Sequence, residues 1–121
     1  MTTVLIVQPG IAPQVAQVGV TLDWLQRSVG GWIEAIYERD HEWVGFVNEE
    51  GKIMGMDFNP LAQDIAITFR WRGALGDMLV GPVVFLGKEH SEDESVAETY
   101  EDVSQEMVNY AMHRYAAVYD V

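Results

Sequence analysis

Carboxylates recur in the C-terminal part of the chain at spacings that would suit binding to a basic partner. Negative charges set at intervals attract a positively charged protein surface and can occupy a site built for the phosphates of DNA. A solvated helix face would produce the same pattern, so partner binding is one of two interpretations. The candidate partner-binding residues are Glu94, Glu98, Glu101, Asp102 and Glu106.

A short basic and aromatic cluster forms a second candidate site. Arg70, Trp71 and Arg72 place two guanidinium groups beside an indole in an otherwise acidic chain. Guanidinium groups bind anions through paired hydrogen bonds and stack on aromatic rings. This cluster predicts, as an alternative, a site for an anionic ligand such as a nucleotide. The simpler interpretation is that both arginines neutralise nearby carboxylates.

The sequence offers little for catalysis or metal binding. The histidines His41, His90 and His113 are far apart, and none has a second histidine at metal-ligand spacing. The pair Glu34 and Glu38 has no visible base, nucleophile or oxyanion donor beside it. The glycines match neither a Walker pattern nor a dinucleotide fingerprint. We therefore expect no enzyme activity, no catalytic residues, no metal and no cofactor.

The charge balance narrows the class of partner. The 121 residues carry 19 acidic and 7 basic side chains, for a formal net charge of −12. Direct binding to nucleic acid is disfavoured because affinity for phosphate depends on Lys and Arg. The chain has no cysteine, no signal-peptide pattern at its start and no apolar run of about 20 residues. These features predict a cytoplasmic protein that does not bind membranes.

The strands that would hold these sites follow from apolar and β-branched runs. A first strand, paired on both sides, is expected at 3–8, and a weak strand or ordered loop at 11–18. Two aromatic runs joined by a short polar link predict a hairpin, and a turn at Gly51 predicts a further short strand. These segments are 32–38, 42–48 and 52–56, and a last strand is expected within 78–86, with Pro82 at a bulge or edge early in it.

Helix signals appear at three places. Thr21 is a plausible N-cap, and Gly30 with Gly31 would end that helix. Asn59 and Pro60 form a good start for a second helix, although residues 65–71 fit either a helix face or an alternating strand. Residues 95–119 carry an apolar stripe at helical spacing, which predicts a long amphipathic C-terminal helix.

Together these elements predict a small α+β fold. We expect a mixed or antiparallel meander packed by two short helices and the long C-terminal helix. Residues 1–88 would form the core domain. Residues 89–121 would form an acidic linker and a helix that packs on the core or on another subunit, so a homo-oligomer is an option.

Tryptophan usage adds a hint about surfaces. Trp24, Trp32, Trp43 and Trp71 are many for a chain of this length. Most should lie in the core. A partly exposed one would mark a binding surface, because Trp is over-represented at interface hot spots.

Four short segments, taken in order, resemble the small phage and plasmid proteins grouped as domain-of-unknown-function family 3846. The segments are 29–35, 48–52, Asn59 with Ala62, and 80–84. The resemblance covers roughly residues 4–86, and the acidic tail extends beyond it. It implies a phage or mobile-element origin and expression in a bacterial cytoplasm, and it implies no catalytic residues.

These observations lead to two functional hypotheses. The first is a non-enzymatic accessory protein that binds and modulates a host protein, such as a basic DNA-binding protein, through an acidic surface that mimics DNA. The alternative is a module that binds or sequesters a nucleotide in counter-defence.

Overall fold

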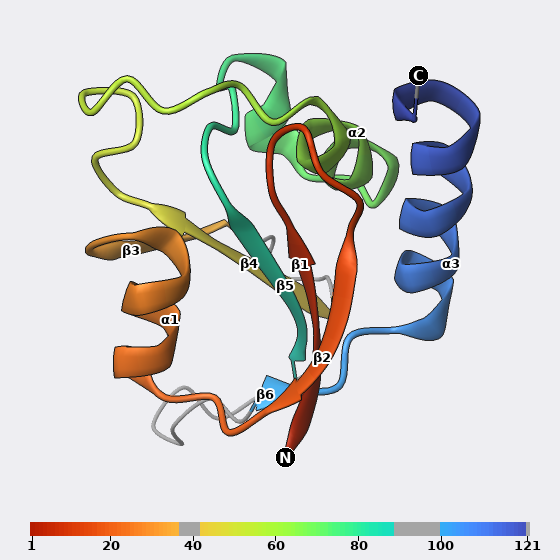
Figure 1. Ribbon diagram of the computed structural model, residues 1–121, viewed down its shortest axis with the longest axis horizontal. Helices are drawn as coiled ribbons and strands as arrows, with labels where there is room; N and C mark the ends of the chain where they lie inside the picture. The colour runs from red at the N-terminus through yellow and green to blue at the C-terminus, as the bar shows by residue number, and fades with distance from the viewer. Residues whose placement is uncertain (37–41, 89–99, 121) are drawn as a thin grey trace.

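The computed structural model describes residues 1–36, 42–88 and 100–120, and its centre is one antiparallel sheet (Figure 1). The six strands are β1 (Thr2–Val7), β2 (Gln14–Val18), β3 (Ile33–Ile36), β4 (Trp43–Asn48), β5 (Val83–Lys88) and β6 (Tyr100–Glu101). Their order is β2-β1-β5-β4-β3, and β6 pairs with the end of β5. This arrangement places β5 at the middle of the sheet, where both of its faces are covered.

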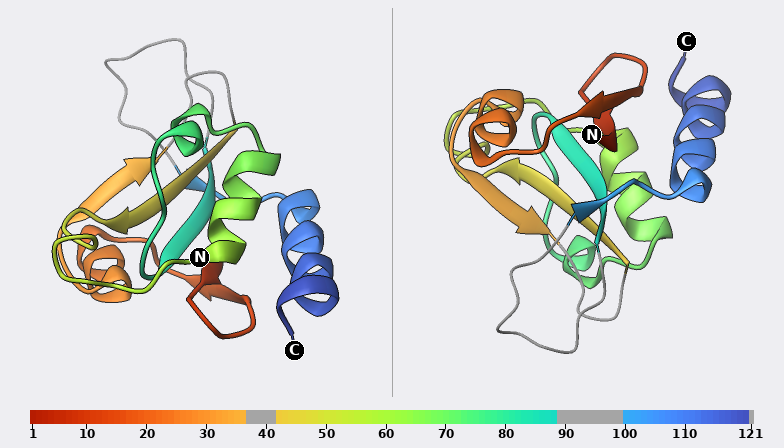
Figure 2. Two further views of the ribbon diagram at one scale, coloured as in Figure 1. Left: turned by 90° about the horizontal axis from the view of Figure 1, so that it is seen from above. Right: turned by 90° about the horizontal axis from the view of Figure 1, so that it is seen from below.

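Helices cover the two faces of this sheet (Figure 2). Helix α1 (Leu22–Val29) packs on one face, whereas α2 (Pro60–Thr68) and α3 (Gln105–Arg114) pack on the other. Along β5, Val84 and Leu86 face α1, and Val83 and Phe85 face α2 and α3. A strand buried on both sides needs a continuous apolar run, which explains its sequence. The predicted α+β class is confirmed.

The strand predictions in the first half of the chain are largely confirmed. β1 pairs with β2 on one side and β5 on the other, so the expected double pairing is present. β3 and β4 pair antiparallel as the expected hairpin, whose link at 37–41 lies outside the described residues. The prediction that Pro82 lies inside the last strand, at a bulge or edge, is wrong: Pro82 directly precedes β5, which is a central strand, and there its missing N–H removes no ladder hydrogen bond.

Local capping signals fix the ends of α1 and the start of α2. The Thr21 hydroxyl accepts a hydrogen bond from the Trp24 amide at 3.0 Å, and Gly30 ends α1 with a left-handed φ of 83°. Asn59 caps α2, and Pro60 occupies its first turn. These residue types were predicted at these positions because their own chemistry suits helix ends.

The ambiguous segment at 65–71 is helical through Thr68 and then turns sharply. The Trp71 amide donates to the Ala66 carbonyl at 2.8 Å, and the Arg70 amide donates to the Ile67 carbonyl at 3.0 Å. This pair of bonds is the Schellman arrangement that ends many helices. Arg70 has φ 72°, at the position where glycine is usual.

The prediction of a strand at residues 52–56 is wrong. These residues form turns, closed by hydrogen bonds from the Met54 amide to the Glu50 carbonyl and from the Met56 amide to the Gly51 carbonyl. The side of β4 that such a strand would have occupied is taken by β5, which pairs with β4 from Trp43 to Phe46. The meander therefore stops after β4.

The C-terminal helix is present but begins later than expected. Ser104 caps α3 through its hydroxyl, which accepts from the Met107 amide at 3.1 Å, and a π-helical turn, η2 (Tyr115–Tyr119), continues it. The expected start at Ser95 is outside the described residues, and Tyr100 and Glu101 form a strand instead of helix. The Val103 amide donates to the Thr3 carbonyl, so pairing with the sheet overrides helical periodicity there.

α3 packs on its own chain. Met107 and Ala111 are buried against the sheet and α2, together with Val103. Within the described ranges, no helix combines the length and apolar character needed to cross a membrane.

A buried asparagine joins three parts of the fold. Asn59 is fully buried; its side-chain amide donates to the Val7 carbonyl at 2.9 Å and the Gly81 carbonyl at 2.8 Å, and its side-chain oxygen accepts from the Ala62 amide at 3.1 Å. These bonds tie the end of β1 and the approach to β5 to the first turn of α2. Each satisfies a group that is shielded from water.

We expect Asn59→Ala to lower the free energy of unfolding by about 3–5 kcal/mol, because it removes a helix cap and leaves buried polar groups unpaired. Urea unfolding followed by circular dichroism measures the change. Asn109→Ala, at an exposed site on α3, is the control and should change stability by about 0.5 kcal/mol or less. Equal effects of the two substitutions would contradict the role assigned to Asn59.

A carboxylate on α2 anchors α3 and η2. Asp64 accepts hydrogen bonds from Tyr110 Oη at 2.6 Å, Arg114 Nε at 2.7 Å and Tyr119 Oη at 3.1 Å. Burial raises the pKa of Asp64, but these bonds and the charge of Arg114 outweigh it, so its pKa lies below the usual value of 3.8. Burial and the bond to Asp64 raise the pKa of Tyr110 and Tyr119, which therefore remain neutral donors at pH 7.

Asp64→Asn should lower the melting temperature at pH 7, because the amide is a weaker acceptor for three donors. A carboxylate whose pKa is lowered in the folded state stabilises the fold above the unfolded value and loses that contribution as the pH falls through the folded value. The difference between parent and variant should therefore shrink below about pH 4. Thermal unfolding from pH 7 to pH 3 measures it, with Asp57→Asn as an exposed control. Parallel curves for parent and Asp64→Asn would contradict the prediction.

Candidate functional site

An open groove lies between the end of α2 and the start of α3. The two helices lie side by side on one face of the sheet (Figure 2), and residues of β4, β5 and β6 also line the groove. Its volume is about 690 Å³. Ligand pockets typically measure roughly 300–1,000 Å³. We call it the α2–α3 groove; its lining residues are Glu42, Trp43, Thr68, Phe69, Arg70, Gly87, Lys88, Glu101, Asp102, Ser104, Glu106, Met107 and Tyr110.

Aromatic side chains form the inner wall of this groove. Trp43 Nε1 donates to the Phe69 carbonyl at 3.0 Å, which ties the last turn of α2 to β4. Phe69 and Tyr110 meet edge to face, with ring centroids 5.9 Å apart and planes at 81°. Tyr110 is also held by Asp64, so the wall is fixed from both helices. An ordered aromatic wall offers apolar contact at little cost in side-chain entropy.

Four carboxylates line the groove: Glu42, Glu101, Asp102 and Glu106. Asp102 has a structural partner, because its Oδ1 accepts from the Thr3 amide at 2.8 Å. Glu101 on β6 and Glu106 in the first turn of α3 are exposed, and neither forms an ion pair with another described residue. They are therefore available to a cationic ligand.

Arg70 and Lys88 supply positive charge in the same groove. Within the described part of the chain, Arg70 is the one residue other than glycine with a positive φ. A side chain in the left-handed region costs of order 1–3 kcal/mol, and such strain gathers at functional sites. The helix would end at lower cost with glycine at this position, so the arginine is the residue in the groove that local backbone chemistry does not explain.

The structure brings together residues that the sequence had placed in two separate candidate sites. Glu101, Asp102 and Glu106 lie in one groove with Arg70. The other two acidic candidates, Glu94 and Glu98, lie outside the described residues. Partner binding through these side chains stays a prediction.

The other two residues of the basic and aromatic cluster, Trp71 and Arg72, do not line the groove. Trp71 is only 8% exposed and belongs to the core, so its ring has little surface to offer a ligand. Arg72 starts the short 3₁₀ turn η1 (Arg72–Leu75), and its side chain does not line the groove. Of the three residues proposed for an anionic ligand, Arg70 retains a place in a pocket.

Sequence reasoning missed several lining residues. Phe69, Lys88 and Tyr110 come from α2, β5 and α3, and no local pattern connects them. Trp43 was noted only as one of four tryptophans. Among residues 1–36, 42–88 and 100–120, no three histidine, aspartate or glutamate side chains lie where they could hold a metal ion together.

Comparisons with known proteins give one family. No curated protein and no solved structure matches the chain. The family model described as Domain of unknown function (DUF3846) matches residues 1–113. The expected limit of the resemblance near residue 86 is therefore wrong, since the match runs through most of α3, which packs on the sheet as part of the domain. The chain belongs to the DUF3846 family.

Proposed function

We propose that this protein is a non-enzymatic binding protein whose α2–α3 groove takes a basic segment of a partner protein. The observation that carries the proposal is that four carboxylates, against two basic side chains, line a groove with an ordered aromatic wall. The exposed glutamates Glu101 and Glu106 have no ion pair among the described residues. A positively charged ligand would provide the ion-pair partner that these two glutamates lack.

The groove suits a lysine or arginine side chain in particular. The apolar stem of such a side chain can lie along the rings of Phe69 and Tyr110, while its charged end reaches the carboxylates. A cation over an aromatic face gains about 0.5–2 kcal/mol. The net charge of −12 would also raise the association rate with a basic partner.

The partner class that fits these features is a DNA-binding protein of a bacterial host. Such a protein presents a basic surface that a row of carboxylates can occupy in place of phosphates. The acidic residues of this part of the chain that line the groove are Glu101, Asp102 and Glu106. On this proposal the protein acts as an accessory factor of a phage or other mobile element, in the cytoplasm of the host.

An octa-arginine peptide is the probe for the groove. We expect Glu101→Lys/Glu106→Lys to weaken its binding at least tenfold, because charge-assisted hydrogen bonds contribute about 1.5–3 kcal/mol each and 1.4 kcal/mol is a factor of ten. Fluorescence anisotropy of a labelled peptide at 150 mM salt measures the affinity.

The matched control is Asp57→Lys/Asp120→Lys, which changes the net charge equally at two exposed sites outside the groove. It should weaken binding no more than about threefold, as expected for screened charges at a distance. Equal losses in the two double variants would mean that net charge, and not the groove, attracts the peptide, and the proposal would fail.

A second candidate function rests on Arg70. Its strained backbone and its place in the groove favour a role for the guanidinium, which binds phosphate through two parallel hydrogen bonds. A nucleotide or other small anion held by Arg70, with an aromatic ring beside it, would make the protein a sequestering module that acts in counter-defence.

Two variants at Arg70 separate the side chain from the backbone. Arg70→Gly should raise the free energy of unfolding by about 0.5–1 kcal/mol, because glycine relieves the left-handed strain but is costlier to order. Arg70→Ala loses the guanidinium and keeps the strain, so it should not be more stable than the parent.

A thermal-shift assay with a panel of nucleotides should show binding to the parent and loss of binding in both Arg70 variants. If none of the nucleotides raises the melting temperature of the parent protein, the nucleotide function is ruled out.

A further inference from the structure

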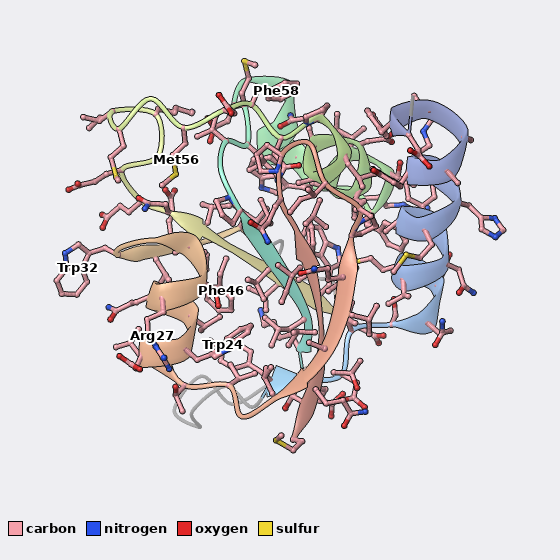
Figure 3. All side chains as sticks on the ribbon, viewed as in Figure 1. Trp24, Arg27, Trp32, Phe46, Met56 and Phe58 are labelled. Carbon is pink, nitrogen blue, oxygen red and sulfur yellow. The ribbon has the colours of Figure 1, made fainter. Side chains whose placement is uncertain are left out.

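A group of large apolar side chains is exposed beside the edge strand β3. Trp32 is 67% exposed, Ile53 is 87% exposed and Met54 is 56% exposed. The Trp32 ring projects away from the sheet into solvent (Figure 3). Large exposed apolar groups carry a solvation cost, and where they gather they commonly mark a contact surface. None of these residues lines the α2–α3 groove.

Hydrogen bonds hold this group in place. The Glu49 amide donates to the Trp32 carbonyl at 2.8 Å, and the Met54 amide donates to the Glu50 carbonyl at 2.9 Å, so the backbone of Trp32 is tied to the start of the turn that carries Ile53 and Met54. Asn48, which is buried, donates to the Val29 carbonyl at 3.1 Å and accepts from the Glu50 amide at 2.8 Å. The turn after β4 is thereby tied to the end of α1. A rigid platform loses little entropy when it binds a partner.

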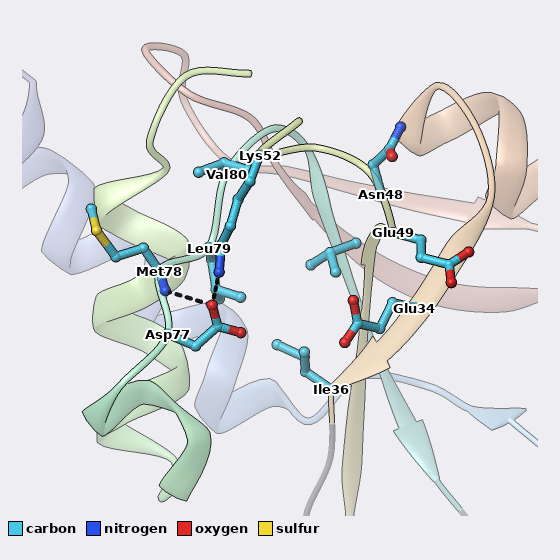
Figure 4. A pocket seen from close by; sticks show the side chains of 10 residues that line it. Glu34, Ile36, Asn48, Glu49, Lys52, Asp77, Met78, Leu79 and Val80 are labelled. Atoms are coloured by element: carbon cyan, nitrogen blue, oxygen red, sulfur yellow. Dashed lines mark hydrogen bonds and ion pairs between the residues drawn. The ribbon is translucent and has the colours of Figure 1, made fainter. Parts of the chain in front are cut away.

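A small hollow is lined in part by Glu49 and Lys52, which belong to the same turn after β4 (Figure 4). Its volume is about 100 Å³, and Ile36, Val47 and Leu79 form its apolar lining. Glu34 turns its carboxylate toward the hollow from β3, while Lys52 and Asp77 form an ion pair on the other side. A hollow this size accepts the end of one side chain and is too small for a drug-sized ligand.

The charges near Trp32, Ile53 and Met54 indicate which kind of partner would bind there. Lys52 is neutralised by Asp77, whereas Glu34, Glu49 and Glu50 form no ion pair with another described residue. The free charge here is therefore negative. A second copy of the chain, with its net charge of −12, would bring like charges together.

We infer that Trp32, Ile53 and Met54, with Glu34, Glu49 and Glu50, form a second docking surface, the Trp32 surface, for a basic amphipathic helix of a partner protein. The apolar face of such a helix covers Trp32, Ile53 and Met54, and a lysine or arginine beside that face enters the hollow toward Glu34. Methionine and tryptophan suit this contact, since methionine adapts to varied side chains and tryptophan is common at hot spots. This surface is separate from the groove of the proposed function.

The test uses an 18-residue helical peptide of leucine and lysine, with leucine at every third and fourth position, and a scrambled peptide of the same composition. We expect Trp32→Ser/Ile53→Ser to weaken binding of the amphipathic peptide at least tenfold by isothermal titration calorimetry. Glu34→Lys/Glu49→Lys should weaken it similarly. The control Leu22→Ser/Ile67→Ser removes two exposed apolar side chains elsewhere and should change affinity less than twofold.

Four outcomes would overturn this inference. One is equal binding of the scrambled peptide, and another is unchanged affinity in Trp32→Ser/Ile53→Ser. The third is concentration-dependent dimerisation of the parent that this variant abolishes, seen by analytical ultracentrifugation, because a second copy would then be the occupant. Glu101→Lys/Glu106→Lys should weaken binding of the amphipathic peptide no more than about threefold, as expected for screened charges at a distance. If this variant alone abolishes it, the peptide sits in the groove, and the Trp32 surface fails while the proposed function stands.

Discussion

The buried amide of Asn59 is the contact on which the arrangement of the α2 face depends. Three chain segments bring backbone groups to one water-free point, and each group would remain unsatisfied without a partner there. A side chain with both donors and an acceptor, and without charge, meets that demand, and asparagine is the short residue that has it. Because Asn59 also caps α2, the same residue sets where this helix begins and where it sits on the sheet.

The position of α2 then determines the groove. Its first turn is tied to β1 and to the approach to β5, its middle holds α3 through Asp64, and its end carries Phe69 and Arg70 into the groove wall. The strained Arg70 lies at the point where the helix must stop. Strain at one residue is tolerated when surrounding contacts over-determine its conformation, as the bond from Trp43 to Phe69 does here.

The carboxylates lie beside differently shaped apolar surfaces at the two proposed binding sites. In the α2–α3 groove, carboxylates lie beside an aromatic wall that is recessed between helices. At the Trp32 surface, they surround apolar side chains that project into solvent. A recessed wall suits single side chains, whereas a projecting one suits the face of a helix. On the two proposals, the net charge of −12 would favour a basic partner at each surface, and the local shape would distinguish the two partners.

The sequence alone determined features whose physics is local. Thr21 and Asn59 cap helices through side chains that reach amides three residues away, and the apolar run of β5 requires burial on both faces. Tertiary structure decided that β5 lies beside β4, and this pairing excluded a strand at 52–56. It also decided that Tyr100 pairs with β5 before α3 begins. It also assembled the groove, because the α2 end, the β5 end and α3 are distant in sequence. Pairing between distant strands depends on competition between segments for the same partner strand. The outcome therefore cannot be predicted from the sequence of any one segment.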